Sequence, residues 1–442
     1  MAGQTASGIT LTAHQQTALD QLHAFLDSPE RMFVLAGYAG TGKTTLLQAF
    51  ISQLQDRGDR RVVVFSAFTN KATKVLNQMV SAWGLDVDCL TCCQLLGLRP
   101  QIDPETGEQE FIPDPDQENS FGKFALVVID ECSMINRNLW ELLQTELYAY
   151  HLTTQILFVG DSAQLPPINE VASQTFLSIA NKVLLTEVVR YGSSIGRLAE
   201  SVRCNLDSYC LPTFRTDLSP DMTEGTVVLR EAEWRQQLLR AFTCENSQAD
   251  PDYVRALAYT NQRVTALNRR IRDAIFGSEA CRFVPGERLI ATSPVFRRED
   301  EILMQTSAEC WVADAYEDEA SGWRVWRLLV ETDANLDIDV TVLHESEQQR
   351  FQRELQRLAE YKQWQDFWRL KQQRFANLNY SYALTIHKSQ GSTFANVFVD
   401  LPNLMRDDLR SAFGHRNLKE RNQLLYVAVT RAAKRLFICQ AH

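Results

Sequence analysis

Two segments that can handle phosphate stand at opposite ends of this 442-residue chain. Near the start, residues 37–44 read GYAGTGKT and match the phosphate-loop pattern G-x-x-x-x-G-K-[ST]. Near the end, residues 426–431 read YVAVTR, an apolar run that predicts a strand followed by an arginine. A nucleotide site whose lysine and arginine are so far apart is expected to close between two domains. Hydrolysis in such a site would open and shut a cleft, which is how a molecular motor works.

The composition fits a soluble chain with several structural units. Its length predicts two to four units, and 45% hydrophobic with 23% charged residues is ordinary for a globular protein. No apolar run approaches the roughly 18 residues of a membrane span, and the N-terminus has no signal-peptide pattern. These features predict a cytoplasmic protein without a membrane partner. A net charge of −10 argues against a passive nucleic-acid coat, but a groove needs only local basic residues.

The ten cysteines show no paired framework. Cys89, Cys92 and Cys93 have the only zinc-like spacing, and the sequence has no second pair of ligands that would complete a zinc site with them. Buried free thiols in a reducing cytoplasm are the favoured interpretation, with metal binding as the alternative.

The phosphate loop has the sequence context that makes it a binding site. Residues 31–36 predict a buried strand and residues 44–54 a helix, and strand, loop and helix in that order form an ATP site. In it, Gly40 and Gly42 let backbone N–H groups face phosphate oxygens, Lys43 reaches the β and γ phosphates, and the Thr44 hydroxyl ligates Mg²⁺. ATP and Mg²⁺ are the predicted cofactors. The predicted ATP-binding residues of this loop are Gly37, Ala39, Gly40, Thr41, Gly42, Lys43, Thr44 and Thr45.

Three further strands of the same core are predicted at 62–67, 124–129 and 156–159. Each ends in polar residues, as expected where ligands bind at the carboxyl edge of an open parallel sheet. Asp130 and Glu131 follow the second of these strands: Asp130 suits a Mg²⁺ ligand, and Glu131 suits the group that polarises the attacking water. Gln164 follows the third strand and can sense the γ-phosphate by hydrogen bonding.

A second core is predicted after residue 180. Strands are expected at 254–260, 380–385, 397–401 and 424–429, with a basic helix running from Asn261 through Arg272. Arg190 and Arg431 both suit arginine fingers, each worth about 10³–10⁵ in rate. A surface salt bridge is the alternative for either arginine. His387 beside Lys388 and Ser389 predicts a phosphate-contacting loop rather than a structural histidine.

Two insertions interrupt these cores. Between residues 281 and 344, β-rich runs at 287–291, 310–315, 323–330 and 338–343 predict a small antiparallel barrel. Residues 345–376 predict one long helix, whose aromatics Trp364, Phe367 and Trp368 we expect to pack rather than stack on bases. Residues 101–120 carry seven carboxylates and no lysine or arginine. They predict a hairpin with a turn at 103–107 and a second strand at 109–112, or a disordered acidic loop.

The order of these motifs resembles that of superfamily 1 helicases, specifically the RecD/Dda-like branch that moves 5′→3′. The likeness covers nearly the whole chain and is carried by specific strings. They are LTAHQQTAL (the Q motif), GYAGTGKTT (motif I), AFTNKA (Ia), TCCQLLG (Ib), VVIDECSM (II), GDSAQLPPI (III), LLTEVVRY (IV), YTNQRVTALN, TIHKSQGSTF (V) and LLYVAVTRA (VI). Motif Ib departs from the family pattern, so only Thr91 is carried over from it.

The resemblance implies an α/β fold with two RecA-like doubly wound parallel-sheet domains. Residues 1–98 and 122–180 would form the first core, with residues 99–121 as its β-hairpin (pin) insertion. Residues 181–280 and 377–442 would form the second core, with residues 281–376 as an SH3-like β-barrel and helix insertion.

The resemblance also implies site residues. Gln15 would read adenine. DNA would be contacted by Thr69, Asn70, Lys71, Thr91, Pro166, Thr260, Asn261, Thr385, His387, Lys388 and Ser389.

The sequence therefore predicts an ATP-dependent DNA helicase that acts on single-stranded DNA and forks, with replication, repair or recombination proteins as possible partners. Two alternatives stay open. One is an RNA helicase or ribonucleoprotein remodeller, because phosphate contacts alone do not choose the sugar. The other is an ATP-gated recruitment switch in a repair, transposition or defence complex.

Overall fold

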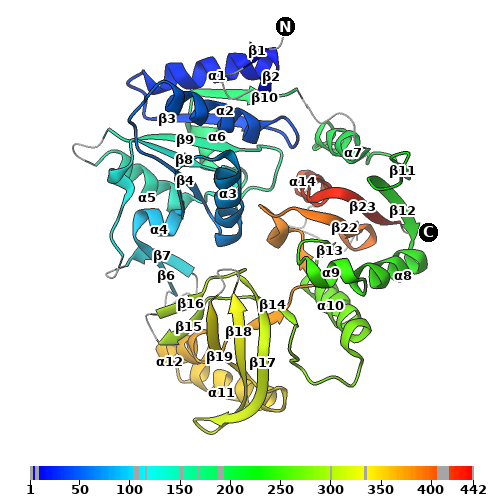
Figure 1. Cartoon of the computed structure of the whole chain (residues 1–442). Coiled ribbons are helices and arrows are strands. Elements are labelled where there is room, and N and C mark those ends of the chain that lie inside the picture. The colour runs from blue at the N-terminus through cyan, green and yellow to red at the C-terminus, as the bar shows by residue number, and fades with distance from the viewer. Residues whose placement is uncertain are drawn as a thin grey trace. The chain divides into compact units, whose positions relative to one another are not determined.

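The computed structural model describes residues 3–4, 9–102, 109–114, 117–149, 153–167, 170–187, 194–298, 301–332, 336–405 and 418–440. The chain divides into two compact units. The first unit comprises Met1–Arg99, Pro113–Trp234 and Ser389–His442, and the second comprises Pro100–Ile112 and Arg235–Lys388. Figure 1 shows the elements of both units along the chain.

The first unit contains a six-stranded sheet in the order β10-β3-β9-β8-β4-β5. All its pairings are parallel. The four inner strands are almost wholly buried, and the two edge strands, β5 and β10, are partly exposed. The strands predicted at 31–36, 62–67, 124–129 and 156–159 are confirmed, and β5 and β10 are additions. The strands are β3 (Met32–Gly37), β4 (Val63–Ala67), β5 (Asp88–Thr91), β8 (Leu126–Ile129), β9 (Gln155–Gly160) and β10 (Lys182–Leu185).

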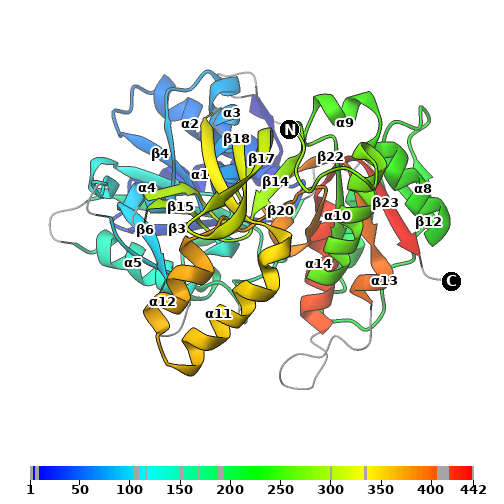
Figure 2. The same ribbon diagram turned by 90° about the horizontal axis from the view of Figure 1, so that it is seen from below.

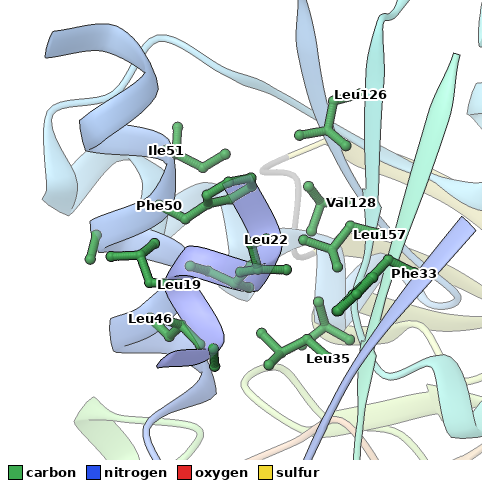
Figure 3. Packing of buried hydrophobic residues seen from close by; sticks show 14 of the residues in the cluster. Leu19, Leu22, Phe33, Leu35, Leu46, Phe50, Ile51, Leu126, Val128 and Leu157 are labelled. Carbon is green, nitrogen blue, oxygen red and sulfur yellow. The ribbon is translucent and has the colours of Figure 1, made fainter. Parts of the chain in front are cut away.

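Helices flank this sheet and enclose the main core of the first unit. In Figure 3, Leu19 and Leu22 of one helix and Phe50 of the next point toward Val128 and Leu157 of the strands. Full burial of side chains of this kind contributes about 1.5–3 kcal/mol each. The helices are α1 (Ala13–Leu26), α2 (Lys43–Asp56), α3 (Asn70–Trp83), α4 (Cys92–Leu96), α5 (Arg137–Leu147) and α6 (Gln174–Ser178). A short pair, β1 (Gly3–Gln4) and β2 (Thr10–Leu11), precedes α1.

Each unit contains further strands. In the first unit these are β11 (Asp217–Leu218), β12 (Gly225–Arg230), β22 (Phe394–Asp400) and β23 (Ala432–Gln440), with β12, β23 and β22 parallel. In the second unit, β13 (Val254–Ala258) and β21 (Ala383–Thr385) are a parallel pair. The first unit also contains the helices α7 (Ser194–Arg203), α13 (Leu401–Leu404) and α14 (Leu418–Thr430). The second unit contains α9 (Glu245–Ala249) and α10 (Asn261–Phe276), and α8 (Glu231–Phe242) runs from the first unit into the second.

The strand predicted at residues 424–429 is wrong. These residues belong to helix α14, which lies beside β22 and β23 (Figure 1). Residues 421–429 are all buried. A helix buried on every side has no polar face, so its sequence shows no 3.6-residue period and reads like a buried strand.

The second unit contains a five-stranded antiparallel sheet, the accessory sheet, in the order β19-β18-β17-β14-β20. It confirms the β-rich runs predicted between 281 and 344. The predicted strand at 380–385 is wrong as a single element, because its first part joins the accessory sheet and its second part is β21. The strands are β14 (Arg288–Ala291), β17 (Glu309–Ala320), β18 (Trp323–Thr332), β19 (Asp337–Leu343) and β20 (Leu378–Tyr380), with a separate pair β15 (Val295–Arg298) and β16 (Glu301–Met304).

The single long helix predicted at 345–376 is also wrong. Helix α11 (Gln348–Glu360) ends before Lys362, whose φ of 56° is left-handed. Helix α12 (Trp364–Trp368) and a π-helical turn (Arg369–Gln373) follow. Both helices lie beside the accessory sheet (Figure 2). Phe367 packs against the cluster that holds Trp323 and Leu355, which confirms packing for that aromatic.

Buried ion pairs join the accessory sheet to β13 and α10 within the second unit. Arg255 of β13 is fully buried and donates to Glu309 Oε2 at 3.0 Å. Arg272 of α10 pairs with Glu287, which is also fully buried. Removing one partner of such a pair costs about 3–5 kcal/mol, because a buried charge is left alone. The accessory sheet is therefore fixed to these two elements.

The acidic segment includes a pair of strands, β6 (Leu98–Ile102) and β7 (Gln109–Pro113). The second strand of the predicted hairpin is confirmed. The predicted turn at 103–107 lies outside the described residues.

Candidate nucleotide site and nucleic-acid contacts

The phosphate loop connects β3 to α2, and its glycines are required by geometry. Gly40 and Gly42 have φ values of 79° and 80°, in the left-handed region. A Cβ on Gly37 would lie 2.7 Å from Thr41 Oγ1 and 3.1 Å from Leu185 Cβ. Larger residues at these three positions would therefore deform the loop.

Lys43 begins α2, at the end of the loop. Its Nζ donates to the carbonyl oxygens of Gly37 at 2.7 Å and Tyr38 at 3.1 Å. Thr44 and Thr45 are exposed in the first turn of the same helix. The positive end of a helix and a lysine at one loop make a site for phosphate groups.

Gln15, the predicted adenine reader, is buried, and its side chain is bonded on both sides. Its Oε1 accepts from Thr12 N at 3.0 Å, and its Nε2 donates to Thr41 O at 3.1 Å. Thr12 and Gln15 form a capping box that starts α1. The structure therefore places Gln15 as a link between α1 and the phosphate loop.

The two adjacent carboxylates lie at the carboxyl end of β8. Asp130 Oδ1 accepts from Glu131 N at 2.8 Å, and Glu131 has a left-handed φ of 51°. Burial and the neighbouring Glu131 raise the pKa of Asp130 to about 6, and Lys43 acts in the opposite direction. Strained backbone of this kind is concentrated at functional sites.

These residues fit a magnesium ion. Asp130 is a carboxylate at the end of β8 directly beside Glu131, and burial and that neighbouring charge raise its pKa. Mg²⁺ is usually held by one or two protein oxygens together with substrate phosphates and water. Thr44 and Asp130 would supply those oxygens. Within the described ranges, no group of three or more His, Cys, Asp or Glu gathers as a separate metal site.

The loop after β9, residues 161–165, carries Gln164. The side-chain Oε1 of Gln164 is buried and has no hydrogen-bond partner. Its backbone is held instead: Gln164 N donates to Asp161 O at 3.2 Å, and Gln164 O accepts from Gln423 Nε2 at 2.9 Å. Asp161 Oδ1 accepts from Ala163 N at 2.9 Å and tightens the same loop.

Helix α14 contacts both this loop and the phosphate loop, all within the first unit. The Tyr426 hydroxyl donates to Asp161 Oδ2 at 2.6 Å and accepts from Ala39 N at 2.9 Å. Gln423 lies one turn earlier on the helix and binds Gln164, as above. The sequence missed both residues because residues 424–429 read as a strand; a helical assignment would have placed Gln423 and Tyr426 on one face.

Of the two predicted finger arginines, the structure describes only Arg431. Arg431 is buried directly after α14, and its guanidinium donates to Val427 O at 3.2 Å and Ser392 O at 3.0 Å. Arg190 lies outside the described residues. A third arginine, Arg203 of α7, stacks with its guanidinium carbon 3.9 Å from the Tyr38 ring centroid in the phosphate loop.

The predicted DNA contacts of the first unit start helices or lie close to them. Thr69 caps α3 and Thr91 caps α4, each accepting a backbone N–H through its hydroxyl. Asn70 is the first residue of α3, and Lys71 lies with Nζ 4.8 Å from the Phe394 ring centroid. Pro166 is half-buried, whereas Ser389 is fully buried.

The predicted contacts of the second unit lie close together. A pocket of about 330 Å³ is lined by Asn261, Thr385 and Lys388, among others. Thr260 caps α10 and accepts from Arg263 N at 3.3 Å. His387 lies with its ring centroid 6.1 Å from that of Tyr259.

Burial lowers the pKa of both His387 and Lys388. His387 is therefore neutral at physiological pH, because its ordinary pKa is already below 7. It can accept or donate a hydrogen bond but adds no positive charge to this loop.

The cysteines with zinc-like spacing are free thiols, with Cys92 buried and Cys89 and Cys93 half-buried. Burial raises the pKa of Cys89 and Cys92 to about 11 and that of Cys93 to about 12.

The sequence matches two family models. Residues 10–205 match the model described as an AAA domain, and residues 380–439 match the UvrD-like helicase C-terminal domain. Over 463 residues the chain is 26% identical to the ATP-dependent DNA helicase dda of Enterobacteria phage T4, covering 97% of this chain and 98% of that protein. It is 23% identical over 508 residues to Uncharacterized protein R530 of Acanthamoeba polyphaga mimivirus, covering 96% and 98%.

The fold is similar to that of solved helicase structures. Bacteroides Pif1 in complex with ADP-AlF3 and ssDNA superposes with a TM-score of 0.50 and 15% identity, covering 97% of this chain and 92% of that one. A structure of two coordinating Pif1 helicases at forked dsDNA gives a TM-score of 0.50 at 16% identity, with the same coverage. Two parallel-sheet RecA-like domains with an antiparallel insertion are the shared architecture. Among the described residues, no helix is both long and apolar enough to cross a membrane.

Proposed function

We infer that this chain belongs to the Pif1/Dda-like branch of the superfamily 1 helicases and is an ATP-dependent DNA helicase. One observation carries the inference: a single helix, α14, binds both the phosphate loop and the loop that carries Gln164. A nucleotide site bonded to a helix of the other sheet can convert the loss of a phosphate into a movement of that helix. That is the requirement for a motor.

Each residue of the nucleotide site has a proposed role. Lys43 binds the β and γ phosphates, and Glu131 orients the attacking water. Thr44 and Asp130 hold Mg²⁺, which neutralises developing phosphate charge when bound. Gln164 contacts the γ-phosphate by donating a hydrogen bond from its side-chain Nε2. Arg190 and Arg431 stabilise charge in the transition state once the site closes, and Arg431 would exchange its carbonyl partners to do so.

The second part of the proposal concerns DNA. Thr69, Asn261 and the His387–Ser389 loop contact strand phosphates, and alternating grip by the two RecA-like cores moves the protein 5′→3′. The accessory sheet, with its helices, is an SH3-like module of the second core; its strand β20 lies just beyond the predicted bound at residue 376. Single-stranded DNA and DNA forks are the substrates, and replication, repair or recombination proteins are the partners.

ATP turnover with single-stranded DNA, duplex DNA and RNA tests this function. We expect single-stranded DNA to stimulate turnover most, and Lys43→Ala to abolish it in every case. Stimulation by RNA alone would instead indicate a ribonucleoprotein remodeller. Slow turnover with ATP retained until a partner protein is added would indicate a recruitment switch.

A further inference from the structure

The hydroxyl of Tyr426 has two partners from distant parts of the sequence. It donates to Asp161 Oδ2 at 2.6 Å and accepts from the backbone N–H of Ala39 at 2.9 Å. Tyr426 and Asp161 are each only 1% exposed, so their hydrogen bond is shielded from solvent. A phenol that both donates and accepts in a buried place fixes the separation of its two partners.

Two glutamines reinforce the contact on one side. Gln423 donates to Gln164 O at 2.9 Å, and Gln390 donates to Leu165 O at 3.3 Å. Together with Tyr426 they bind three positions of the five-residue loop 161–165. The loop is therefore held by its backbone and by Asp161, while the Gln164 side-chain oxygen is left unpartnered.

We propose that Tyr426 is a positioning residue for ATP hydrolysis, whose hydroxyl fixes the loop that carries Gln164 against the phosphate loop at Ala39. The proposal rests on the ATPase assignment above. Tyr426 does not contact the phosphates itself. Ala39 belongs to the phosphate loop, and its N–H donates to the tyrosine hydroxyl. The tyrosine thus sets where Gln164 lies relative to the nucleotide.

The variant Tyr426→Phe keeps the ring and removes both hydrogen bonds. We expect kcat for ATP to fall about 10- to 100-fold, because a small displacement of a positioned group has an effect of that size. KM for ATP should change less than about threefold, because Lys43 and the loop glycines are untouched. A raised KM with unchanged kcat would overturn the proposal, since it would assign Tyr426 to nucleotide binding.

The route through Gln164 is tested by a double-mutant cycle. If Tyr426 acts by aligning Gln164, then Tyr426→Phe should have little further effect on kcat in a Gln164→Ala background. Losses that multiply in the double variant would overturn the proposal.

Tyr382→Phe is the matched control. Tyr382 is also a buried phenol, 3% exposed, but its hydroxyl accepts only from Arg288 N, at 3.5 Å, inside the second unit. It should keep near wild-type kcat and KM; an equal loss of kcat there would overturn the proposal as a general effect of losing a buried hydroxyl. Absence of ATP turnover in the wild-type chain would contradict the ATPase assignment instead, so the two failures are distinguishable.

Discussion

At the scale of the residue, the chemistry of the nucleotide site follows from local sequence, but its connections do not. Gly40, Gly42, Lys43 and Asp130 are recognisable because strand, loop and helix are neighbours in the chain. Tyr426 and Asp161 are 265 residues apart, and no local pattern pairs a tyrosine with that carboxylate. The adenine-reading role of Gln15 stays a prediction; the sequence motif gave no sign that its amide also bonds to Thr12 and Thr41 within the protein.

The roles of Glu131 and Asp130 can be separated by mutation. Glu131→Gln should keep ATP and DNA binding but lose hydrolysis, because Asp130 and Lys43 remain to hold the nucleotide and its metal. Lys43→Ala should instead lose ATP binding and turnover together. Nucleotide binding and single-turnover hydrolysis measure the two effects. Near wild-type hydrolysis by Glu131→Gln would remove the water-orienting role from this residue.

The raised pKa of Asp130 predicts a dependence of stability on pH. Its folded-state pKa of about 6 exceeds the unfolded value of roughly 3.9. The folded, metal-free protein therefore binds more protons than the unfolded chain between these values, and its free energy of unfolding falls as pH rises through about 6. The variant Asp130→Asn has no carboxyl group to ionise there, so near pH 8 its free energy of unfolding should exceed that of the wild type by on the order of 1–3 kcal/mol.

Thermal melts in chelator measure this effect. The gain from Asp130→Asn should vanish near pH 4, where the wild-type carboxyl is already protonated. Asp86→Asn, which changes an exposed carboxylate, should give no difference at either pH. A gain of equal size at both pH values would mean that packing, not charge, is responsible.

At the scale of the element, strands β3, β4, β8 and β9 were predictable because each apolar run ends in a polar motif, whereas β5, β10, β12 and β23 were not predicted. Three further segments were predicted wrongly. Helix α14 is buried on all sides and has no period to read. The helix break at Lys362 occurs without glycine or proline, at a positive φ that the tertiary structure imposes. The segment at 380–385 divides between two sheets, which depends on partners far away in sequence.

The β6–β7 hairpin should separate the strands of a fork. Its segment carries seven carboxylates and no lysine or arginine at 101–120, so it repels phosphate and does not grip DNA. Replacing residues 102–117 with a Gly-Ser linker should leave single-strand-stimulated ATP hydrolysis largely intact while duplex opening falls sharply. Unwinding and ATPase assays on the same preparation give the comparison. Unchanged unwinding would make this segment a loop without a role at the fork.

At the scale of the whole molecule, the family resemblance predicts direction of movement, which no single residue does. A partial duplex with a 5′ single-stranded tail should be opened, and one with only a 3′ tail should not. A blunt duplex serves as the control for end fraying. Preference for the 3′ tail would place the chain outside the branch that moves 5′→3′.

The buried arginine–glutamate pairs of the second unit bear on how such proteins can be recombined. A fragment cut at residues 281 and 376 would carry Glu287 and Glu309 but leave Arg272 and Arg255 behind. In a hybrid with another protein, this fragment would bury two carboxylates without their arginine partners, which would destabilise the hybrid. The accessory sheet therefore cannot be transferred to another protein without the two arginines, Arg255 and Arg272, that pair with its glutamates.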